Sequence, residues 1–227
     1  MKFGNVTVLP AAGLATRMRG LPKFMLPCTD GNETLIERHI RLSIPTSDLL
    51  CVVTRPSYAP LLASLGILSD KVLLSVTETE TMNATVKGIT DWVQSERFTV
   101  IMPDTFFGGQ TPYQYLASAP SSLNLALWTI RESQKGKLGQ IQLGDGGKVV
   151  GHSDKNSSCD FPYAWGALSF SSKLQDLLDP SDPHVGYMIE PALREGTKVA
   201  AEIMDGDYFD CGTPSEFQDL TASRWVS

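Results

Sequence analysis

The residues best suited to chemistry lie in one loop near the N-terminus, which follows an apolar segment and ends at Lys23. Its small residues, centred on Gly13, let the backbone approach a ligand and turn its N–H groups toward phosphate oxygens. Arg17 and Lys23 add two cations to the same loop, and the combination suits a triphosphate. The loop is neither a Walker A loop nor a Gly-x-Gly-x-x-Gly fingerprint, because it lacks the spacing of residues that those motifs require.

This loop follows a predicted strand at 6–9, the first element of an alternating series. Continuous apolar runs such as 49–54 are typical of parallel strands that are covered on both faces. Thr34 and Glu37 have the spacing of a capping box, which predicts the start of a helix over 33–43. Further strands are predicted at 72–76, 98–102 and 123–130, and further helices at 59–65 and 83–94. Such alternation predicts right-handed βαβ units in a mostly parallel sheet.

The second half of the chain departs from this alternation. Residues 138–150 predict a β-hairpin that turns at Gly144–Gly147, and Ser215 is the expected N-cap of a closing helix over 215–222. Strands are also predicted at 164–170 and 199–203, and helical segments at 174–178 and 188–194. We therefore predict an α/β fold, a Rossmann-like, mostly parallel mixed sheet with flanking helices and a β-hairpin insertion, built as one domain over residues 1–227.

The composition limits the class of protein. Hydrophobic residues make up 42% and charged residues 19% of the 227 residues, as in ordinary globular domains. The net charge of -6 argues against a nucleic-acid partner, which usually meets a clustered basic surface. The apolar run at 6–12 is too short and wrongly flanked for a secretory signal or a membrane span, so we expect a cytoplasmic protein with no membrane partner.

Cysteine and histidine give no separate signal. The four cysteines contain no Cys-x-x-Cys pair, so we expect reduced and mostly buried thiols rather than a zinc or redox site. Cys211 differs from the other cysteines because it lies between Asp210 and Gly212. His39, His152 and His184 do not cluster along the chain, and we expect structural or surface roles for all three.

The first loop resembles the signature of a known family. Ala11-Ala12-Gly13-x-x-Thr16-Arg17-Met18, followed by Pro22-Lys23, resembles the loop of the sugar-1-phosphate nucleotidyltransferases, which usually reads Gly-x-Gly-Thr-Arg before Pro-Lys. Ala15 replaces the second glycine. The resemblance implies a GT-A-like nucleotidyltransferase fold. It also implies a magnesium-dependent enzyme that joins a nucleoside monophosphate from a triphosphate to a phosphorylated sugar and releases pyrophosphate.

Other segments resemble the same family in the same order along the chain. Pro103-Asp104 resembles the strand-end aspartate that binds magnesium, and Asp210-Cys211-Gly212-Thr213-Pro214 resembles the Asp-x-Gly-Thr-Pro motif whose aspartate completes the metal site. Asp154-Lys155 resembles a Glu-Lys-Pro segment in which Asn156 replaces the proline. The base-contacting segment, the sugar-contacting glycine strand and the strand that lines the acceptor pocket correspond to 81–85, 138–141 and 163–166.

The resemblance implies a role for each candidate residue. The candidate catalytic residues are Arg17, Lys23, Asp104, Lys155 and Asp210, of which Asp104 and Asp210 would hold Mg²⁺. The candidate nucleotide-binding residues are Ala11, Ala12, Gly13, Thr16, Arg17, Lys23, Asn83 and Thr85. The candidate acceptor-binding residues are Gly139, Asp154, Lys155, Gly166 and, from its position alone, Glu190.

The reaction implied by the resemblance can be catalysed by cationic side chains and metal-binding carboxylates alone. The attacking phosphate oxygen is already ionised at neutral pH, so the reaction needs no general base. The enzyme must instead align two anions that repel each other and stabilise the charge that develops. Magnesium usually takes one or two carboxylates together with substrate phosphates, which suits the two aspartates.

Three other functions stay open on the sequence. Cytidylyltransferases that act on polyol, choline-like or other alcohol phosphates carry similar loops, although the Asp-x-Gly-Thr-Pro ending favours the sugar type. A catalytically silent nucleotide-binding regulatory protein is suggested by Ala15 and Asn156. A glycosyltransferase would normally show Asp-x-Asp at the strand end, and 103–106 lacks the second aspartate. The sequence indicates neither the base, the acceptor nor the oligomeric state.

Overall fold

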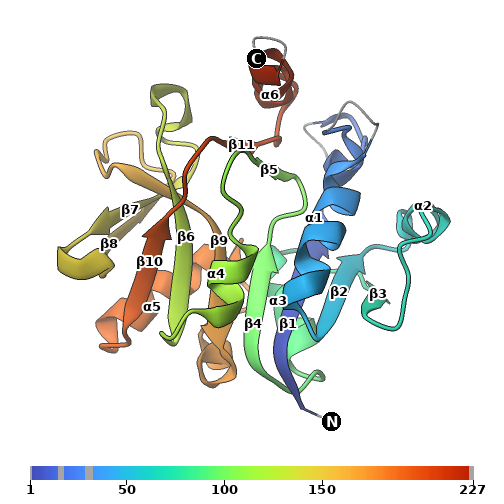
Figure 1. Cartoon of the computed structure of the whole chain (residues 1–227), viewed down its shortest axis with the longest axis horizontal. Helices are drawn as coiled ribbons and strands as arrows, with labels where there is room; N and C mark the ends of the chain where they lie inside the picture. The colour runs from blue at the N-terminus through green and yellow to red at the C-terminus, as the bar shows by residue number, and fades with distance from the viewer. Residues whose placement is uncertain (1, 15–17, 29–32, 225–227) are drawn as a thin grey trace.

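The computed structural model describes residues 2–14, 18–28 and 33–224, and its centre is a sheet with the strand order β10-β6-β9-β4-β1-β2-β3 (Figure 1). The strands of this path are β1 (Phe3–Ala11), β2 (Leu49–Thr54), β3 (Val72–Val76), β4 (Ser95–Ile101), β6 (Leu123–Thr129), β9 (Tyr163–Ser171) and β10 (Val199–Ile203). The helices are α1 (Leu35–Ser43), α2 (Ala59–Ser64), α3 (Met82–Thr90), α4 (Tyr113–Ser118), α5 (Ile189–Arg194) and α6 (Pro214–Arg224).

The sheet is mixed but mostly parallel. Strand β1 pairs in parallel with β2 and β4, β2 pairs in parallel with β3, and β10 pairs in parallel with β6. Strand β9 runs antiparallel to its neighbours β4 and β6. A hairpin of β7 (Gly139–Leu143) and β8 (Val149–Asp154) joins the same sheet through β9. The predicted fold class, including the hairpin insertion, is confirmed.

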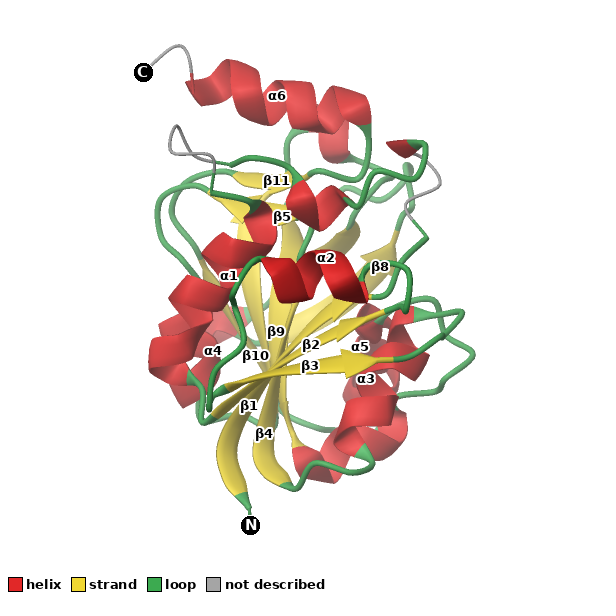
Figure 2. Cartoon of the chain, turned by 90° about the vertical axis from the view of Figure 1, so that its right-hand side faces the viewer, coloured by secondary structure: helices red, strands yellow, loops and turns green. Residues whose placement is uncertain are grey.

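Helices cover both faces of the sheet, α1 and α4 on one face and α3 and α5 on the other (Figure 2). Side chains of β1 alternate between the two cores: Val8 packs in the core that contains Val86 of α3, and Leu9 packs in the core that contains Ile36 of α1. Burial on both faces is why these strands read as unbroken apolar runs. In the described ranges, no helix is long and apolar enough to span a membrane.

Most of the predicted elements are confirmed, and the differences have local causes. The strands predicted at 49–54, 72–76 and 199–203 coincide with β2, β3 and β10, and Thr34 and Glu37 form the predicted capping box of α1. The helix predicted over 83–94 ends at Thr90, because the residues from Ser95 onward pair with β1. Two short strands, β5 (Thr105–Phe107) and β11 (Tyr208–Asp210), and helix α4 were not predicted.

The N-cap prediction for the last helix was wrong. Helix α6 begins at Pro214, so Ser215 lies inside its first turn. The hydroxyl of Thr213 accepts a hydrogen bond from the backbone N–H of Glu216 at 3.4 Å and donates one to Glu216 Oε2 at 2.9 Å. Thr213 therefore does the capping, and Pro214 takes the first helical position, where a missing N–H costs nothing.

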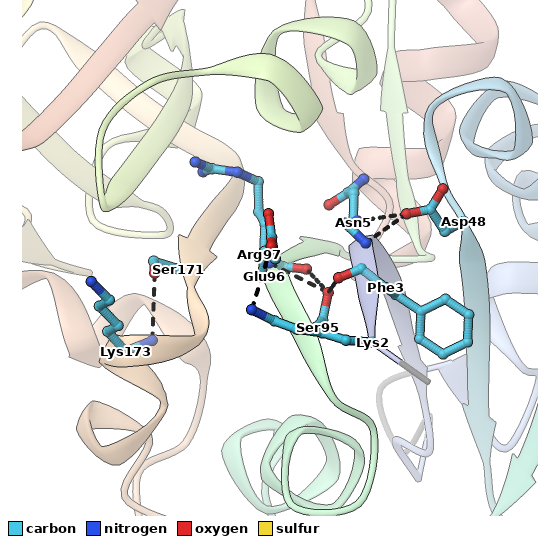
Figure 3. Close-up of polar contacts among 10 residues, drawn as sticks. Lys2, Phe3, Asn5, Asp48, Ser95, Glu96, Arg97, Ser171 and Lys173 are labelled. Carbon is cyan, nitrogen blue, oxygen red and sulfur yellow. Dashed lines mark hydrogen bonds and ion pairs between the residues drawn. The ribbon is translucent and has the colours of Figure 1, made fainter.

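The amino ends of β1 and β4 are joined to their surroundings by polar contacts (Figure 3). Asp48 accepts hydrogen bonds from the backbone N–H groups of Gly4 and Asn5 at 2.7 and 3.1 Å, and the hydroxyl of Ser95 donates to the carbonyl of Arg97 at 2.6 Å. Through these contacts, polar groups at the amino-end edge of the sheet find hydrogen-bond partners within the chain. The opposite edge, at the carboxyl ends of β1 and β4, is where ligands collect in sheets of this kind.

His39 is a fully buried link between α1 and the segment after β4. Its Nε2 lies 2.8 Å from the carbonyl oxygen of Thr105, and its Nδ1 lies 2.7 Å from the hydroxyl of Tyr113. Burial lowers the pKa of His39 to about 4, so the ring is neutral, donates from Nε2 and accepts at Nδ1. The expectation of a structural role for His39 fits this position.

The stability of the protein should therefore fall in acid partly through His39. Because the folded state depresses the pKa from 6.5 to about 4, the unfolded chain binds a proton first as the pH falls. Above pH 6.5 the neutral, buried His39 ring contributes on the order of 3 kcal/mol to the free energy of unfolding. This contribution is lost as the pH approaches 4. Urea unfolding of the wild type and His39→Gln between pH 7 and 4 measures the difference. Identical pH slopes in the two proteins would contradict the assignment.

Candidate active site

A cleft of about 310 Å³ lies at the carboxyl ends of β1 and β4. The two strands are parallel and neighbouring, so the loops that follow them open at the same edge of the sheet. Strand β9 runs the other way and brings its first residues to this edge, as does the end of β8. The described candidate residues that line the cleft are Ala11, Ala12, Gly13, Lys23, Thr85, Asp104, Gly139, Asp154, Lys155 and Asp210.

Strands β5 and β11 bring the two predicted metal aspartates together. They pair antiparallel, with Asp210 opposite Thr105, and the backbone N–H of Cys211 donates to the carbonyl of Asp104 at 2.9 Å. Both aspartates line the cleft. Their carboxylates come from hydrogen-bonded neighbouring segments, so they can face one bound ion although they lie far apart in the sequence.

The donor set suits a magnesium ion. Magnesium prefers oxygen ligands and commonly takes one or two carboxylates, with waters and substrate phosphates completing the octahedron. Asp104 and Asp210 supply two such carboxylates at the cleft. Within the described ranges, no cluster of three or more His, Cys, Asp or Glu side chains could hold a metal ion.

Among the described residues, three lysines line the cleft and give it positive charge: Lys23, Lys137 and Lys155. Lys23 Nζ lies 3.4 Å from Asp104 Oδ2, and the two side chains are 16% and 26% exposed, so this pair is shielded from most of the solvent. Lys155 also lines the cleft, just beyond the end of β8, with its backbone in the left-handed region at φ 47°. Non-glycine residues rarely adopt this conformation, and it is often found at ligand sites.

His184 lines the cleft, in contrast to the expectation of a structural or surface role. Its Nε2 lies 3.2 Å from Asp154 Oδ2. Burial alone would raise the pKa of Asp154, but the hydrogen bond from His184 and the charge of Lys155 hold it below its usual value. Asp154 is therefore ionised at neutral pH, and His184 Nε2 is the donor of this bond. No sequence pattern links the two residues, because the fold alone makes them neighbours.

Asn83 does not reach the cleft. Its side chain is fully buried, and its Nδ2 donates to the carbonyl of Asp179 at 3.0 Å. The neighbouring hydroxyl of Thr81 donates to the carbonyl of Pro180 at 2.6 Å, and the N–H of Met82 donates to the carbonyl of Pro183 at 3.1 Å. The start of α3 is thus hydrogen-bonded to the segment that leads into His184. The side chain of Asn83 is buried because it makes one of these bonds.

Gly166 and Glu190 also lie outside the cleft lining. A Cβ atom at Gly166 would lie 2.6 Å from Cε2 of Tyr208 and 2.8 Å from Cζ3 of Trp128, so this glycine makes room for the aromatic ring of Tyr208, which itself lines the cleft. Glu190 is exposed on the first turn of α5. Neither residue is placed to contact a ligand in the cleft. Thr16 and Arg17 lie outside the described residues.

The cysteines are buried free thiols, as predicted. Burial, together with the carboxylates of Asp104 and Asp210, raises the pKa of the Cys211 thiol well above its usual range. Cys211 is therefore protonated and packs with Phe209 and Leu220 in a small apolar cluster beneath the β5–β11 pair. Its place in the Asp-x-Gly-Thr-Pro segment is structural.

The same fold occurs in solved proteins with low sequence identity. A Bacillus anthracis protein assigned as a glucose-1-phosphate thymidylyltransferase superposes with a TM-score of 0.79 and 16% identity over 98% of this chain and 95% of its own. A UTP-bound UGPase from Acinetobacter baumannii gives 0.74 and 17% identity over 97% and 93%. The inositol-1-phosphate CTP transferase of T. maritima gives 0.73 and 18% identity over 96% and 94%. Neither a protein-family model nor a curated protein sequence matches the chain.

Proposed function

We propose that this protein is a magnesium-dependent nucleotidyltransferase that joins a nucleoside monophosphate, taken from a triphosphate, to a phosphorylated sugar. The observation that carries the proposal is the pair Asp104 and Asp210, placed side by side by the β5–β11 pairing at a cleft that also holds Lys23 and Lys155. The names of the proteins with the same fold support this reaction type. Its predicted signature residues lie in the same cleft wherever the structure describes them, apart from Asn83, Gly166 and Glu190.

The reaction forms a bond between an acceptor phosphate oxygen and the α-phosphorus, while the bond from the α-phosphorus to the oxygen that bridges to the β-phosphorus breaks. Pyrophosphate leaves with that electron pair. The small residues at 11–13 let the backbone lie close to the phosphates, and Lys23 offsets their negative charge. Lys155, which also lines the cleft, holds the acceptor phosphate in line. A magnesium ion on Asp104 and Asp210 would supply further positive charge at the phosphates.

The base and the acceptor belong to separate ends of the cleft in this proposal. Residues 79–82, which lead into the first turn of α3, line the cleft together with Thr85 and are the candidate base-contacting wall. The β7–β8 hairpin and the residue after it supply Gly139, Asp154 and Lys155 to the lining, where the sugar phosphate would lie. The fold does not identify the substrates, since the similar structures are named a thymidylyltransferase, a UDP-glucose pyrophosphorylase and a CTP transferase.

A cytidylyltransferase that acts on an alcohol phosphate is the second candidate. The likeness to the inositol-1-phosphate CTP transferase favours it, because that protein is covered over 94% of its length with the same topology. A silent nucleotide-binding protein is less favoured, since Lys23, Lys155 and both aspartates are all present at the cleft.

The proposal is tested by incubating the purified protein with magnesium, each of five nucleoside triphosphates and a panel of phosphorylated sugars and alcohols. Pyrophosphate release that requires both substrates is the expected result, and the productive pair identifies the base and acceptor. Release only with an alcohol phosphate and CTP would favour the second candidate. Triphosphate binding without pyrophosphate release across the panel would contradict both transferase proposals.

A further inference from the structure

The hydroxyl groups of the candidate base-contacting wall are committed to bonds within the chain. The wall consists of residues 79–82 and Thr85, all of which line the cleft. The hydroxyl of Thr85 donates to the carbonyl of Thr81 at 2.9 Å, so the proton of the 2.5 Å bond between Thr79 and Thr85 comes from Thr79. The hydroxyl of Thr81 donates to the carbonyl of Pro180 at 2.6 Å. Each hydroxyl carries one proton, and none of the three has one left for a ligand.

Glu80 is the remaining polar side chain of the wall. It is exposed, and it makes no hydrogen bond or ion pair within the part of the chain that the structure describes. An ionised carboxylate has two acceptor oxygens and no donor. Met82, the fifth residue of the wall, is apolar. The side chains of the wall therefore offer a ligand acceptors and an apolar surface, but no donor.

The backbone on which Glu80 stands is anchored by its neighbours. Thr81 is the N-cap of α3, and its hydroxyl accepts a hydrogen bond from the backbone N–H of Ala84 at 3.0 Å. The N–H of Met82 donates to the carbonyl of Pro183 at 3.1 Å. A side chain on an anchored backbone loses less conformational freedom on binding than one on a free loop, so its hydrogen bonds discriminate better between ligands.

The nucleotide bases differ in the donors that they present to such a wall. Guanine has two adjacent donors, N1–H and the 2-amino group, which match the two oxygens of one carboxylate. Cytosine and adenine each place an amino group beside an unprotonated ring nitrogen, which a carboxylate repels. Uracil and thymine have a single ring N–H between two carbonyl oxygens. A carboxylate at the base therefore favours guanine most and uracil and thymine least.

We propose that Glu80 is a specificity-determining residue that accepts hydrogen bonds from N1–H and the 2-amino group of guanine, so that GTP is the preferred triphosphate. The inference rests on the proposed function and deepens it, because it names the base that the cleft selects. It concerns the binding of the triphosphate alone, and it is therefore tested without an acceptor.

The test is equilibrium binding by calorimetry, with magnesium present and no acceptor, so that no transfer occurs. The ligands are GTP, ATP, CTP, UTP, dTTP and inosine triphosphate, which differs from GTP only in lacking the 2-amino group. We expect the wild type to bind GTP most tightly, roughly five- to a hundredfold more tightly than UTP and dTTP, with inosine triphosphate in between. Glu80→Gln keeps the size of the side chain but replaces one acceptor with a donor, so it should lose this preference.

Glu78→Gln is the matched control, since Glu78 is an exposed glutamate two residues earlier that does not line the cleft. It should bind all six triphosphates like the wild type. Both variants should unfold at the wild-type temperature, because both side chains are exposed. An equal loss of preference in Glu78→Gln would indicate a general effect of charge and would overturn the role of Glu80.

The other outcomes separate the inference from the proposed function. A wild type that binds another triphosphate as tightly as GTP, or a Glu80→Gln protein with the wild-type preference, would overturn the inference alone. A preference for GTP that depends on Glu80, in a protein that releases no pyrophosphate with any acceptor, would support the inference and remove only the proposed function. A wild type that binds none of the six triphosphates would overturn both.

Discussion

Asp104→Asn and Asp210→Asn are each expected to lower the rate of pyrophosphate release by roughly 10²–10³ or more at saturating magnesium. Each change removes one of two carboxylates that would hold the ion, while it keeps the size of the side chain. The backbone contacts that join the two segments, such as the bond from Cys211 N–H to the carbonyl of Asp104 at 2.9 Å, do not involve the carboxylates. The fold should therefore survive, and thermal unfolding measures that.

Asp207→Asn is the matched control for this prediction. Asp207 lies just before β11, its side chain is 61% exposed, and it pairs with Arg131 at 3.4 Å outside the cleft. Its loss should leave the rate near the wild-type value. If the Asp104 or Asp210 variant turned over at the wild-type rate, the metal assignment would be wrong. A loss of activity in all three variants would indicate a structural effect instead.

Lys155→Met is expected to lower kcat/KM for the acceptor by roughly 10²–10³, with little change in the affinity for the triphosphate. Methionine keeps the length of the side chain and removes its charge, so the acceptor phosphate loses the cation that holds it in line. Glycine would be a poorer choice, because Lys155 has a φ of 47° and glycine would also relax the backbone there.

Lys148→Met serves as the control for Lys155, since Lys148 is an exposed lysine at the turn of the same hairpin and does not line the cleft. Steady-state kinetics with the acceptor varied, together with direct binding of the triphosphate, separates the two effects. An unchanged kcat/KM in Lys155→Met, or an equal loss in Lys148→Met, would remove Lys155 from the site.

The parts of the fold that followed from the sequence are those with a local physical cause. Strand β2 is an unbroken apolar run because both of its faces are buried, and the hydroxyl of Thr34 caps α1 by accepting a hydrogen bond from the backbone N–H of Glu37. Signals of this kind depend on neighbouring residues only. They were enough to predict the α/β sheet and the hairpin insertion.

The parts that were missed depend on distant contacts. Strands β5 and β11 have three residues each, too few for a periodic pattern, and they form because they pair with each other. The β5–β11 pair matters most for function, since it sets Asp104 beside Asp210.

In the candidate site, too, residues with a local sequence signal were predicted and residues placed by distant contacts were not. Lys23 and the small-residue loop are recognisable because their spacing along the chain is part of the signature. His184 was missed because it meets Asp154 only through the packing of the segment before α5 against the start of α3. Asn83 was assigned to the nucleotide by position, but the same packing buries it. Sequence order thus predicted segments that line the cleft, but not which side chain of each segment reaches it.

The most direct test of the central claim follows the α-phosphorus itself. The protein is given magnesium, the productive sugar phosphate and a triphosphate labelled with radioactive phosphorus at the α-position, and the products are separated. We predict that the label appears in a nucleotide joined to the sugar, that unlabelled pyrophosphate forms in equal amount, and that Asp104→Asn forms both at least roughly a hundredfold more slowly. Label that remains in nucleoside mono- or diphosphate, or label transfer that is unchanged in Asp104→Asn, would contradict nucleotidyl transfer at this cleft.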